Sequence, residues 1–203
     1  SFFNFWIKLT QKKYKILKQI IDGRTSKKNI FEEEQLMVAA VSILIEKDNP
    51  NYPIYMIKRA DEGKHALEWA FPGGKMETTD MNLKHTATRE TNEEIGADIK
   101  DFEIWGELDP VMTVGTGWAI QPFVGEINHD PMLLKNDDEV EEIVKIPLFD
   151  LIDDSNKRFV SFIRDDVRVD SKAFAFEDKL IWGASARMII QISDLIENKV
   201  KNG

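Results

Sequence analysis

Three glutamates, Glu90, Glu93 and Glu94, lie within five residues of one another, so close that their charges repel. They belong to the block "FPGGKMETTDMNLKHTATRETNEEIGAD" at residues 71–98. On a helix, at about 100° per residue, the three side chains fall within an arc of about 100° at the border of the apolar stripe. Mg²⁺ and Mn²⁺ prefer carboxylate oxygens as ligands. The block therefore predicts either a solvated acidic helix face or a divalent metal site suited to phosphate chemistry.

The residues around the glutamates predict where their helix begins and ends. Residues 72–75 read "PGGK", in which two adjacent glycines permit a tight turn and leave backbone groups open to a ligand. Asp80 is expected to cap the helix that follows, and Gly96 is expected to end it. Arg89 stands four residues before Glu93 and offsets only part of the repulsion. Together, the glycine turn, the capped helix and the acidic pattern favour the metal site.

With these features the block resembles the signature of the Nudix hydrolases. That signature reads Gly, five residues, Glu, seven residues, Arg–Glu, an apolar residue, one residue, Glu–Glu, one residue, Gly and an apolar residue. The positions of this chain that match it are Gly74, Arg89, Glu90, Glu93, Glu94, Gly96 and Ala97. The chain departs from it by one extra residue before Arg89, by Asp80 in place of the first Glu, and by Thr91 at the apolar position.

An extra residue together with "PGGK" also occurs in the coenzyme A pyrophosphatase branch of this family, and other segments are similar to that branch. They read "ELDPVMTVGTGWAIQPFVGEI" from Glu107, "NDDEVEEIVKIPLFDLID", and "LIWGASARMII" near the end. The similarity covers residues 35–196 in all. The substrate signature of the branch lies just upstream of "FPGG"; this chain keeps Arg59 and His65 there, but the residues between them are fewer and more acidic.

The resemblance implies an α/β (α+β) fold in which a Nudix-type mixed sheet is sandwiched between helices. The Nudix hydrolase domain is expected at residues 35–203, after an N-terminal helix and linker at residues 1–34. Apolar periodicity predicts helices at about 10–22 and 184–199. Segments rich in β-branched or aromatic residues predict strands at 36–45, 52–58, 102–108, 118–127 and 143–146. The stretch "SFIRDDVRVDSKAFAF" reads as a hairpin.

The activity that the resemblance implies is hydrolysis of the diphosphate of a nucleoside diphosphate linked to another group X, with Mg²⁺ or Mn²⁺ as cofactor. The similar branch suggests coenzyme A, cleaved to 3′,5′-ADP and phosphopantetheine. ADP-ribose, NADH or a nucleotide sugar is the alternative substrate. The alternative outside the enzymes is a Nudix module that senses a nucleotide without cleaving it. Loss of the three glutamates would favour the sensor, and this chain retains them.

The resemblance also implies roles for single residues. Metal ligands are expected at Glu90, Glu93, Glu94 and the carbonyl of Gly74. Arg89 is expected to orient a glutamate. The general base is open between Glu93 and a carboxylate of the downstream acidic loop, with Glu139 as first choice and Glu142 as second. Substrate binding is expected at Lys58, Arg59, His65 and Trp69, with Lys64 as a further cation for the 3′-phosphate, although each of these also reads as an ordinary surface or core residue.

The composition argues against several other classes of protein. The 203 residues carry a net charge of −9, which argues against a broad nucleic-acid-binding surface. The chain has no cysteine, so it has neither a disulfide framework nor a thiolate ligand or nucleophile. The longest apolar run, "LMVAAVSILI", is half as long as a membrane span, and no secretory signal is visible. We expect a cytoplasmic protein that acts on a small-molecule nucleotide diphosphate, with a homodimer as one option for its assembly.

Overall fold

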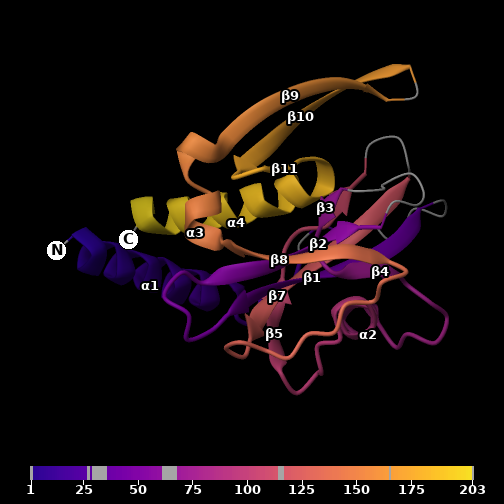
Figure 1. The fold of residues 1–203 in the computed structure, drawn as a ribbon, viewed down its shortest axis with the longest axis horizontal. Helices are drawn as coiled ribbons and strands as arrows, with labels where there is room; N and C mark the ends of the chain where they lie inside the picture. Colours follow the sequence, from indigo (N-terminus) through magenta and orange to yellow (C-terminus); the bar gives the residue numbers. More distant parts are fainter. Residues whose placement is uncertain are drawn as a thin grey trace.

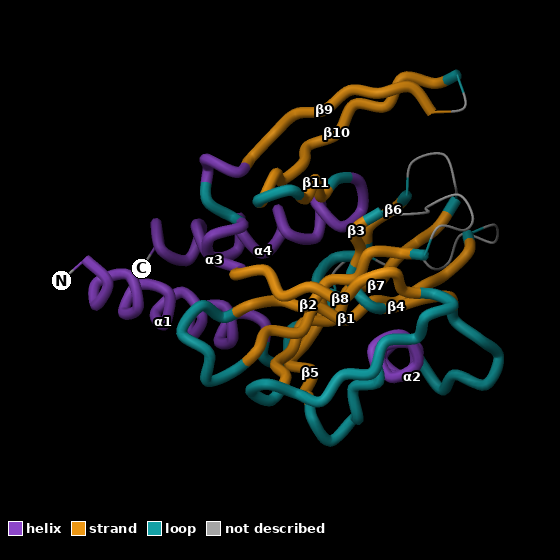
Figure 2. The backbone as a smooth tube through the Cα atoms, viewed as in Figure 1, coloured by secondary structure: helices purple, strands orange, loops and turns teal. Residues whose placement is uncertain are grey.

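The computed structural model describes residues 2–26, 28, 36–60, 68–113, 117–164 and 166–202. At its centre is a mixed β-sheet with helices on both faces (Figure 1). Helix α2 (Leu83–Ile95) covers one face, while α1 (Phe2–Ile21) and α4 (Gly183–Asn202) cover the other (Figure 2). The predicted fold class, a mixed sheet between helices, is confirmed. No helix in these ranges is long and apolar enough to cross a membrane.

Within the described residues, eight strands form the main sheet. They are β1 (Met37–Glu46), β2 (Pro53–Arg59), β3 (Trp69–Ala70), β4 (Gly73–Lys75), β5 (Phe102–Glu107), β6 (Val111–Met112), β7 (Trp118–Ile127) and β8 (Val140–Pro147). A smaller sheet contains β9 (Lys157–Arg164), β10 (Val167–Phe176) and β11 (Lys179–Ile181). The short helix α3 (Leu148–Leu151) and a 3₁₀ turn (Asp154–Asn156) connect the two sheets.

Each of the five strands predicted from the sequence corresponds to a strand of the main sheet, and the predicted hairpin corresponds to β9 and β10. The sequence pattern does not indicate β3, β4 and β6, because strands of two or three residues are too short to show alternation. It also predicts the first helix from about residue 10, whereas α1 begins at Phe2. The extension is favoured by tertiary contacts, since Trp6 and Ile7 are half-buried and Thr10 is buried.

Next to the glycine turn, the neighbouring strands β1 and β2 separate, and each takes a different partner. Strand β1 pairs in parallel with β7 along its whole length, and on its other side it meets β2 where Ile45 lies opposite Ile54. Towards the start of β1 the partner is β4 instead, while β2 pairs with β3. Strands β3 and β4 belong to a single connection, residues 69–75. This connection therefore crosses from β2 to β1 and brings the "PGGK" turn to this division in the sheet.

The larger hydrophobic core lies between the sheet and helices α1 and α4. Leu17 and Ile21 of α1 and Ile189 of α4 are fully buried in it. Full burial of one such side chain contributes about 1.5–3 kcal/mol, so α1 packs as an integral part of the fold. The hairpin of β9 and β10 lies on the far side of α4 from the main sheet (Figures 1 and 2), and Phe162 there packs edge-on against Trp182.

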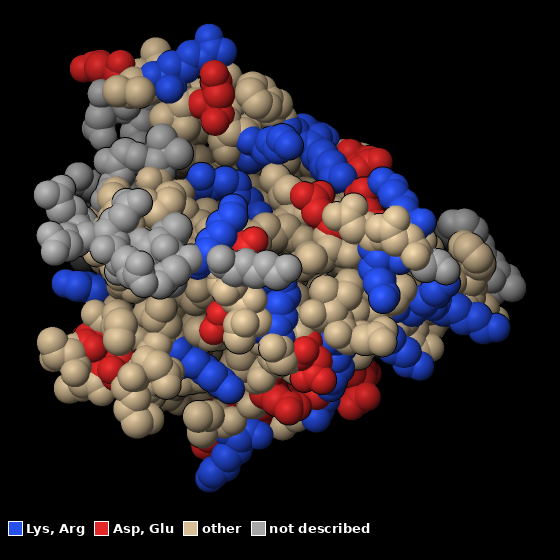
Figure 3. All heavy atoms as spheres, turned by 180° about the vertical axis from the view of Figure 1, so that it is seen from behind, with Lys and Arg blue, Asp and Glu red and all other residues tan. Residues whose placement is uncertain are grey.

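The charge of the chain is unevenly distributed over its surface. Lys and Arg side chains gather at the end of the molecule where α1 lies, on the right in Figure 3. The sequence of α1 contains lysines at positions 8, 12, 13, 15 and 18 and no Asp or Glu. Because the net charge of the chain is −9, the rest of the molecule is more acidic than the total indicates.

A buried carboxylate on β1, that of Glu46, joins three strands. Tyr55 of β2 donates a hydrogen bond to its Oε2 at 2.5 Å, and the Nζ of Lys145 on β8 lies 2.9 Å from the same oxygen. Asn49 donates to Oε1 at 3.1 Å. Burial alone would raise the pKa of Glu46, but the hydrogen bonds from Tyr55, Lys145 and Asn49 outweigh burial and lower the pKa to about 2.

Replacing Glu46 by glutamine should lower the free energy of unfolding by about 2–3 kcal/mol at pH 7, because glutamine fills the site without the charge that its partners favour. In the folded protein the carboxylate stays ionised down to about pH 2, whereas in the unfolded chain it is protonated near its ordinary pKa of 4.5. Its contribution is therefore fully present above about pH 4.5 and is lost as the pH falls towards 2. Urea unfolding of the wild type and the variant at pH 7 and at pH 3 measures this contribution to the free energy of unfolding.

The difference between wild type and variant should be smaller at pH 3 than at pH 7. Glu103→Gln, which changes an exposed glutamate on β5, is the matched control and should leave stability nearly unchanged at both pH values. A Glu46→Gln effect that is the same size at both pH values would show that the ionised carboxylate is not what stabilises the cluster.

Candidate active site

Helix α2, which carries the three glutamates, has a cap at each end. The side chain of Asn82 accepts a hydrogen bond from the backbone N–H of His85 at 2.9 Å and forms the N-cap. At the other end Gly96 has a φ of 69°, the left-handed conformation that favours glycine. The prediction that Gly96 ends the helix is confirmed. The prediction that Asp80 caps it is wrong, because the side chain of Asp80 is buried against another partner.

That partner is Arg89, which Asp80 binds through both carboxylate oxygens. Arg89 donates from Nε to Oδ1 and from Nη2 to Oδ2, each at 2.9 Å. The backbone N–H of Glu77 at 2.9 Å and the hydroxyl of Thr86 at 3.0 Å also donate to Oδ2. The hydrogen bonds from Arg89, outweighing the effect of burial, hold the pKa of Asp80 well below its usual range. Asp80 is thus an ionised, fully buried anchor for the guanidinium.

The remaining nitrogen of Arg89 faces the glutamates. Its Nη1 donates to Oε1 of Glu90 and to Oε2 of Glu93, both at 2.8 Å. Its Nη2 also donates to the backbone carbonyl of Lys75 at 3.1 Å, which ties α2 to β4. Because Asp80 fixes the guanidinium plane, Arg89 in turn fixes the orientation of two glutamates.

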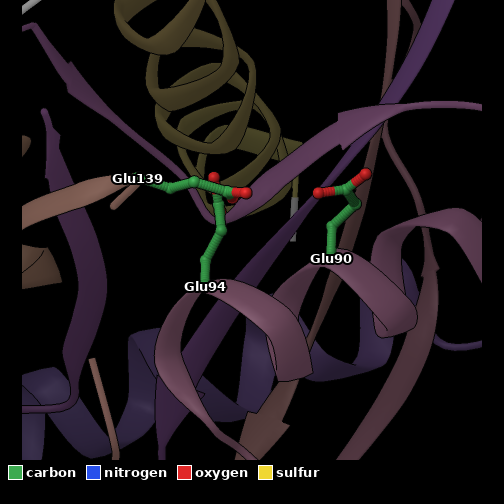
Figure 4. A group of neighbouring side chains, drawn as sticks. All are labelled: Glu90, Glu94 and Glu139. Carbon is green, nitrogen blue, oxygen red and sulfur yellow. The ribbon is translucent and has the colours of Figure 1, made fainter. Parts of the chain in front are cut away.

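Three carboxylates converge beside this network. Each of Glu90, Glu94 and Glu139 offers an oxygen, and these oxygens lie within 4.8 Å of one another (Figure 4). Glu90 and Glu94 come from α2, whereas Glu139 comes from the acidic loop before β8. The loop is held by the backbone N–H of Ala60, which donates to the carbonyl of Glu139 at 3.0 Å. Glu94 is 3% exposed and Glu139 is open to solvent, so the trio connects the core to the surface.

The glycine turn touches two members of this trio. The backbone N–H of Gly73 donates to Oε2 of Glu94 at 2.8 Å. A Cβ at position 73 would lie 2.2 Å from the carbonyl oxygen of Ala40, and one at Gly74 would lie 2.5 Å from the carboxyl carbon of Glu90. Both distances are too short for an unchanged site. At Gly73 the obstacle is backbone, whereas at Gly74 it is the Glu90 carboxyl group, which a side chain would displace from the site. The two glycines are therefore needed for the backbone to approach β1 and the carboxylates.

The electrostatics of the trio oppose its ionisation. Burial raises the pKa of Glu94 to about 8, against a hydrogen bond from Gly73 and the charge of Arg59, and the charges of Glu90 and Glu139 add to the increase. Burial likewise raises the pKa of Glu90. All-oxygen ligand sets of this kind match the preference of hard divalent cations, which also neutralise such repulsion. The donor set of the trio thus fits Mg²⁺ or Mn²⁺.

The other predicted ligands and bases lie around the trio. Glu93 lies outside it, with its side chain 49% exposed and bound to Arg89. Gly74 lies directly against Glu90. Of the two loop carboxylates, Glu139 belongs to the trio, whereas Glu142 is on β8 opposite Lys58 and outside it.

Three of the residues predicted to bind substrate, Lys58, Arg59 and Trp69, lie on β2 and β3. Arg59 is close enough to Glu94 for its charge to act on that pKa. Arg59 and Trp69 line a cavity of about 670 Å³, while Lys58 is not among its lining residues. His65, like Lys64, lies outside the residues that the structure describes.

This cavity extends from the glycine turn, across β1 and β7, to β10 and the start of α4. Its aromatic and charged lining includes Trp118, Trp182, Lys75, Lys172 and Arg187. The sequence gives no signal for this role, because the contributing segments are far apart in the chain and their side chains resemble ordinary core or surface residues.

Comparison with known sequences identifies the family. The sequence profile of the NUDIX domain matches residues 36–165. This chain belongs to the Nudix family. The family predicted from the glutamate block is therefore confirmed.

Two relatives show which Nudix proteins this one is similar to. The human mitochondrial coenzyme A diphosphatase NUDT8 is 32% identical over 126 residues, which are 61% of this chain and 53% of NUDT8. The chain thus matches about half the length of that relative. The Nudix hydrolase NudL of Yersinia pestis is 29% identical over 148 residues, 72% of this chain and 74% of NudL. The first relative is named as mitochondrial, and a cytoplasmic location for this Nudix protein stays a prediction.

A solved structure of similar fold is that of a MutT/nudix family protein from Enterococcus faecalis. It aligns with a TM-score of 0.53 at 18% identity and covers 84% of this chain and 66% of that one. This similarity concerns the fold alone and supports the Nudix architecture of the sheet and helices.

Removing the buried anchor of Arg89 should destabilise the Nudix domain. Asp80→Ala leaves a largely buried guanidinium without its main partner, so the free energy of unfolding should fall by about 3–5 kcal/mol. Asp80→Glu should cost about 1–3 kcal/mol, because an extra methylene must fit into a filled site. Urea unfolding at pH 7 measures both. Asp22→Ala, at an exposed aspartate after α1, is the control. An Asp80→Ala protein as stable as this control would show that Arg89 does not need Asp80 as its partner.

Proposed function

We propose that this Nudix domain hydrolyses the diphosphate of a nucleoside diphosphate linked to a group X, with Mg²⁺ or Mn²⁺ as cofactor. The observation that carries the proposal is the convergence of Glu90, Glu94 and Glu139 beside the open backbone of Gly74, at one end of a cavity large enough for part of a nucleotide. Coenzyme A, cleaved to 3′,5′-ADP and phosphopantetheine, is the preferred substrate in this proposal. The similarity to the human coenzyme A diphosphatase supports that choice.

The proposed metal ligands are Glu90, Glu94 and the carbonyl of Gly74, with Glu93 as a further ligand. When bound, a divalent cation neutralises charge on the diphosphate oxygens and lowers the pKa of a bound water. Other residues of the chain hold these ligands in position. Gly73 holds Glu94 by its N–H, and Arg89 holds Glu90 and Glu93. The ligands are therefore preorganised and need little rearrangement.

Glu139 is the proposed general base, which accepts a proton from the attacking water. It is the solvent-exposed member of the trio, so a proton can leave from it to bulk water. Glu93 is the second candidate, but one of its carboxylate oxygens already accepts a hydrogen bond from Arg89. Lys58, Arg59 and His65 are proposed to bind phosphate oxygens, and Trp69 is proposed to stack on the base of the nucleotide.

The substrate class is tested by a panel of coenzyme A, ADP-ribose, NADH and nucleotide sugars, with product detection in Mg²⁺ and in Mn²⁺. We expect coenzyme A to be cleaved to 3′,5′-ADP with the highest kcat/KM. A higher value for another diphosphate would keep the reaction and replace the substrate. No cleavage of any compound, by protein that still binds nucleotides, would instead support the sensing module.

Glu94→Gln should abolish hydrolysis, a loss of at least about 1,000-fold in kcat, while the protein stays folded, because the amide keeps the shape but loses the charge of the central ligand. Binding of Mn²⁺, followed by electron paramagnetic resonance or calorimetry, should weaken in parallel. In the wild type, Mn²⁺ affinity should rise as the pH increases towards about 8, because Glu94 must lose its proton before it binds the ion.

The Glu94→Gln protein should show a smaller change in Mn²⁺ affinity between pH 6.5 and pH 8.5 than the wild type. Glu141→Gln, an exposed glutamate on β8 beside the site, is the matched control and should leave activity unchanged. An active Glu94→Gln enzyme would rule out its role as a ligand.

A further inference from the structure

The cavity beside the glycine turn has a second end that the proposed reaction does not use. One end is formed by Gly73 and Gly74, which contact the acidic trio. Three tryptophans, Trp69, Trp118 and Trp182, contribute to its walls. Its other end is formed by β10 and the first turn of α4. A substrate whose diphosphate lies at the trio would extend towards this second end.

Arg187 lies at the second end and is incompletely partnered. Its Nη2 donates to the backbone carbonyl of Met112 on β6. Its Nε is buried, and among the residues that the structure describes none accepts a hydrogen bond from it. In the same ranges no carboxylate forms an ion pair with Arg187, whereas Arg24, Arg89 and Arg168 all have one. Burial accordingly lowers the pKa of Arg187.

A half-buried cation without an ion-pair partner is costly, and so is a buried N–H group without an acceptor. An anionic ligand would compensate the charge of Arg187 and accept a hydrogen bond from Nε. The guanidinium suits a phosphate group in particular, because its fork of N–H donors matches phosphate oxygens.

The surroundings of Arg187 also favour an anion. Gly183, Ala184 and Ser185, the first turn of the twenty-residue helix α4, line the cavity. A Cβ placed on Gly183 would meet nothing within 4 Å, so the start of the helix opens onto free space. Backbone N–H groups at a helix start attract negative charge. The N–H of Gly183 donates to Ser171 Oγ at 3.2 Å, so an anion would meet the N–H groups of Ala184 and Ser185. Lys172 adds a cation to the wall. Two carboxylates also line the cavity: Glu68, and Asp170, which is paired with Arg168 at 2.9 Å.

The position of Arg187 separates it from the diphosphate end. At one level of the sheet, Lys75 of β4, Ala39 of β1, Ile120 of β7 and Val111 of β6 lie side by side. Three strand spacings of about 4.8 Å place β6 about 14 Å from β4. The distance from β4 to β6 must hold the bound group and its contacts with the protein at each end. It suits a nucleotide that carries phosphates on both its 5′ and 3′ oxygens. Arg59 lies instead near Glu94, at the diphosphate end.

We propose that Arg187 and the start of α4 bind a phosphate monoester that the substrate carries at a distance from its diphosphate. The inference rests on the proposed function for the diphosphate end and names a narrower substrate class. It also gives two cations of the cavity different roles: Arg59 binds the diphosphate, and Arg187 binds the distal phosphate. Substrates that lack the monoester would leave Arg187 without an anion and bind less tightly.

The test compares adenosine 3′,5′-bisphosphate with adenosine 5′-monophosphate, which differ by the 3′-phosphate alone and contain no diphosphate to hydrolyse. Binding in Mg²⁺ can be followed by tryptophan fluorescence, because Trp69, Trp118 and Trp182 line the cavity, with calorimetry as a second measurement. The wild type should bind the bisphosphate at least about tenfold more tightly. Arg187→Met should remove this preference, and Arg187→Lys should keep part of it.

Two control variants separate the roles. Arg158→Met makes the same change at an exposed arginine outside the cavity and should bind both nucleotides as the wild type does. Arg59→Met should weaken both nucleotides to a similar extent. Thermal unfolding establishes that each variant is folded, and Arg187→Lys keeps the test valid if Arg187→Met does not fold.

Equal affinity of the wild type for the two nucleotides, a preference that survives in Arg187→Met, or no binding of either nucleotide would overturn the proposal. Its failure is distinguishable from failure of the proposed function. A preference that depends on Arg187, in a protein that cleaves no diphosphate, would support the distal site alone. Hydrolysis with equal kcat/KM for coenzyme A and dephospho-coenzyme A would support the reaction and refute the distal site.

Discussion

The structure of the site depends on one constraint, the convergence of three carboxylates of which one, Glu94, is buried. Burial and the charges of Glu90 and Glu139 oppose ionisation of Glu94, while the Gly73 N–H and the charge of Arg59 favour it. The backbone can supply that N–H because the connection between β2 and β1 crosses the division in the sheet and because no side chain intervenes at positions 73 and 74. The division of the sheet and the glycine turn are thus parts of one arrangement that brings donors and cations to the buried acid.

The ion pair of Asp80 and Arg89 lies behind the glutamates and holds two of them in place. In the Nudix signature a glutamate stands at the position of Asp80, and this chain has one extra residue between that position and the arginine. The shorter side chain and the longer connection occur together here, and the result is a carboxylate that binds Arg89 at two oxygens of equal distance. A buried pair of this kind contributes little net stability in itself. Its consequence is positional, since it fixes the guanidinium that orients Glu90 and Glu93.

The glutamate block and most strands could be predicted from the sequence because they depend on local spacing and alternation. The role of Asp80 could not, because Asp80 and Asn82 are both good N-cap residues and a tertiary contact with Arg89 decides between them. The place of Glu139 beside Glu94, 45 positions earlier, depends on backbone hydrogen bonds that hold its loop, such as Ala60 N–H to the Glu139 carbonyl. Sequence could therefore rank Glu139 among the acidic residues of the loop but could not locate it.

The two ends of the cavity are formed by different segments of the chain, so substitutions can alter one end and leave the other unchanged. The acidic end comes mainly from one local block, whereas the other end combines β10, β6 and the start of α4. On α4, Arg187 and Ile190 face the cavity while Ile189 and Ile192 are buried in the core. Substitutions on the cavity side of α4 can thus alter the bound group without touching the carboxylates. Because the same helix closes the core, however, only substitutions that preserve its packing keep the fold. Within α4, changes of specificity are therefore limited to a few positions on one helix face.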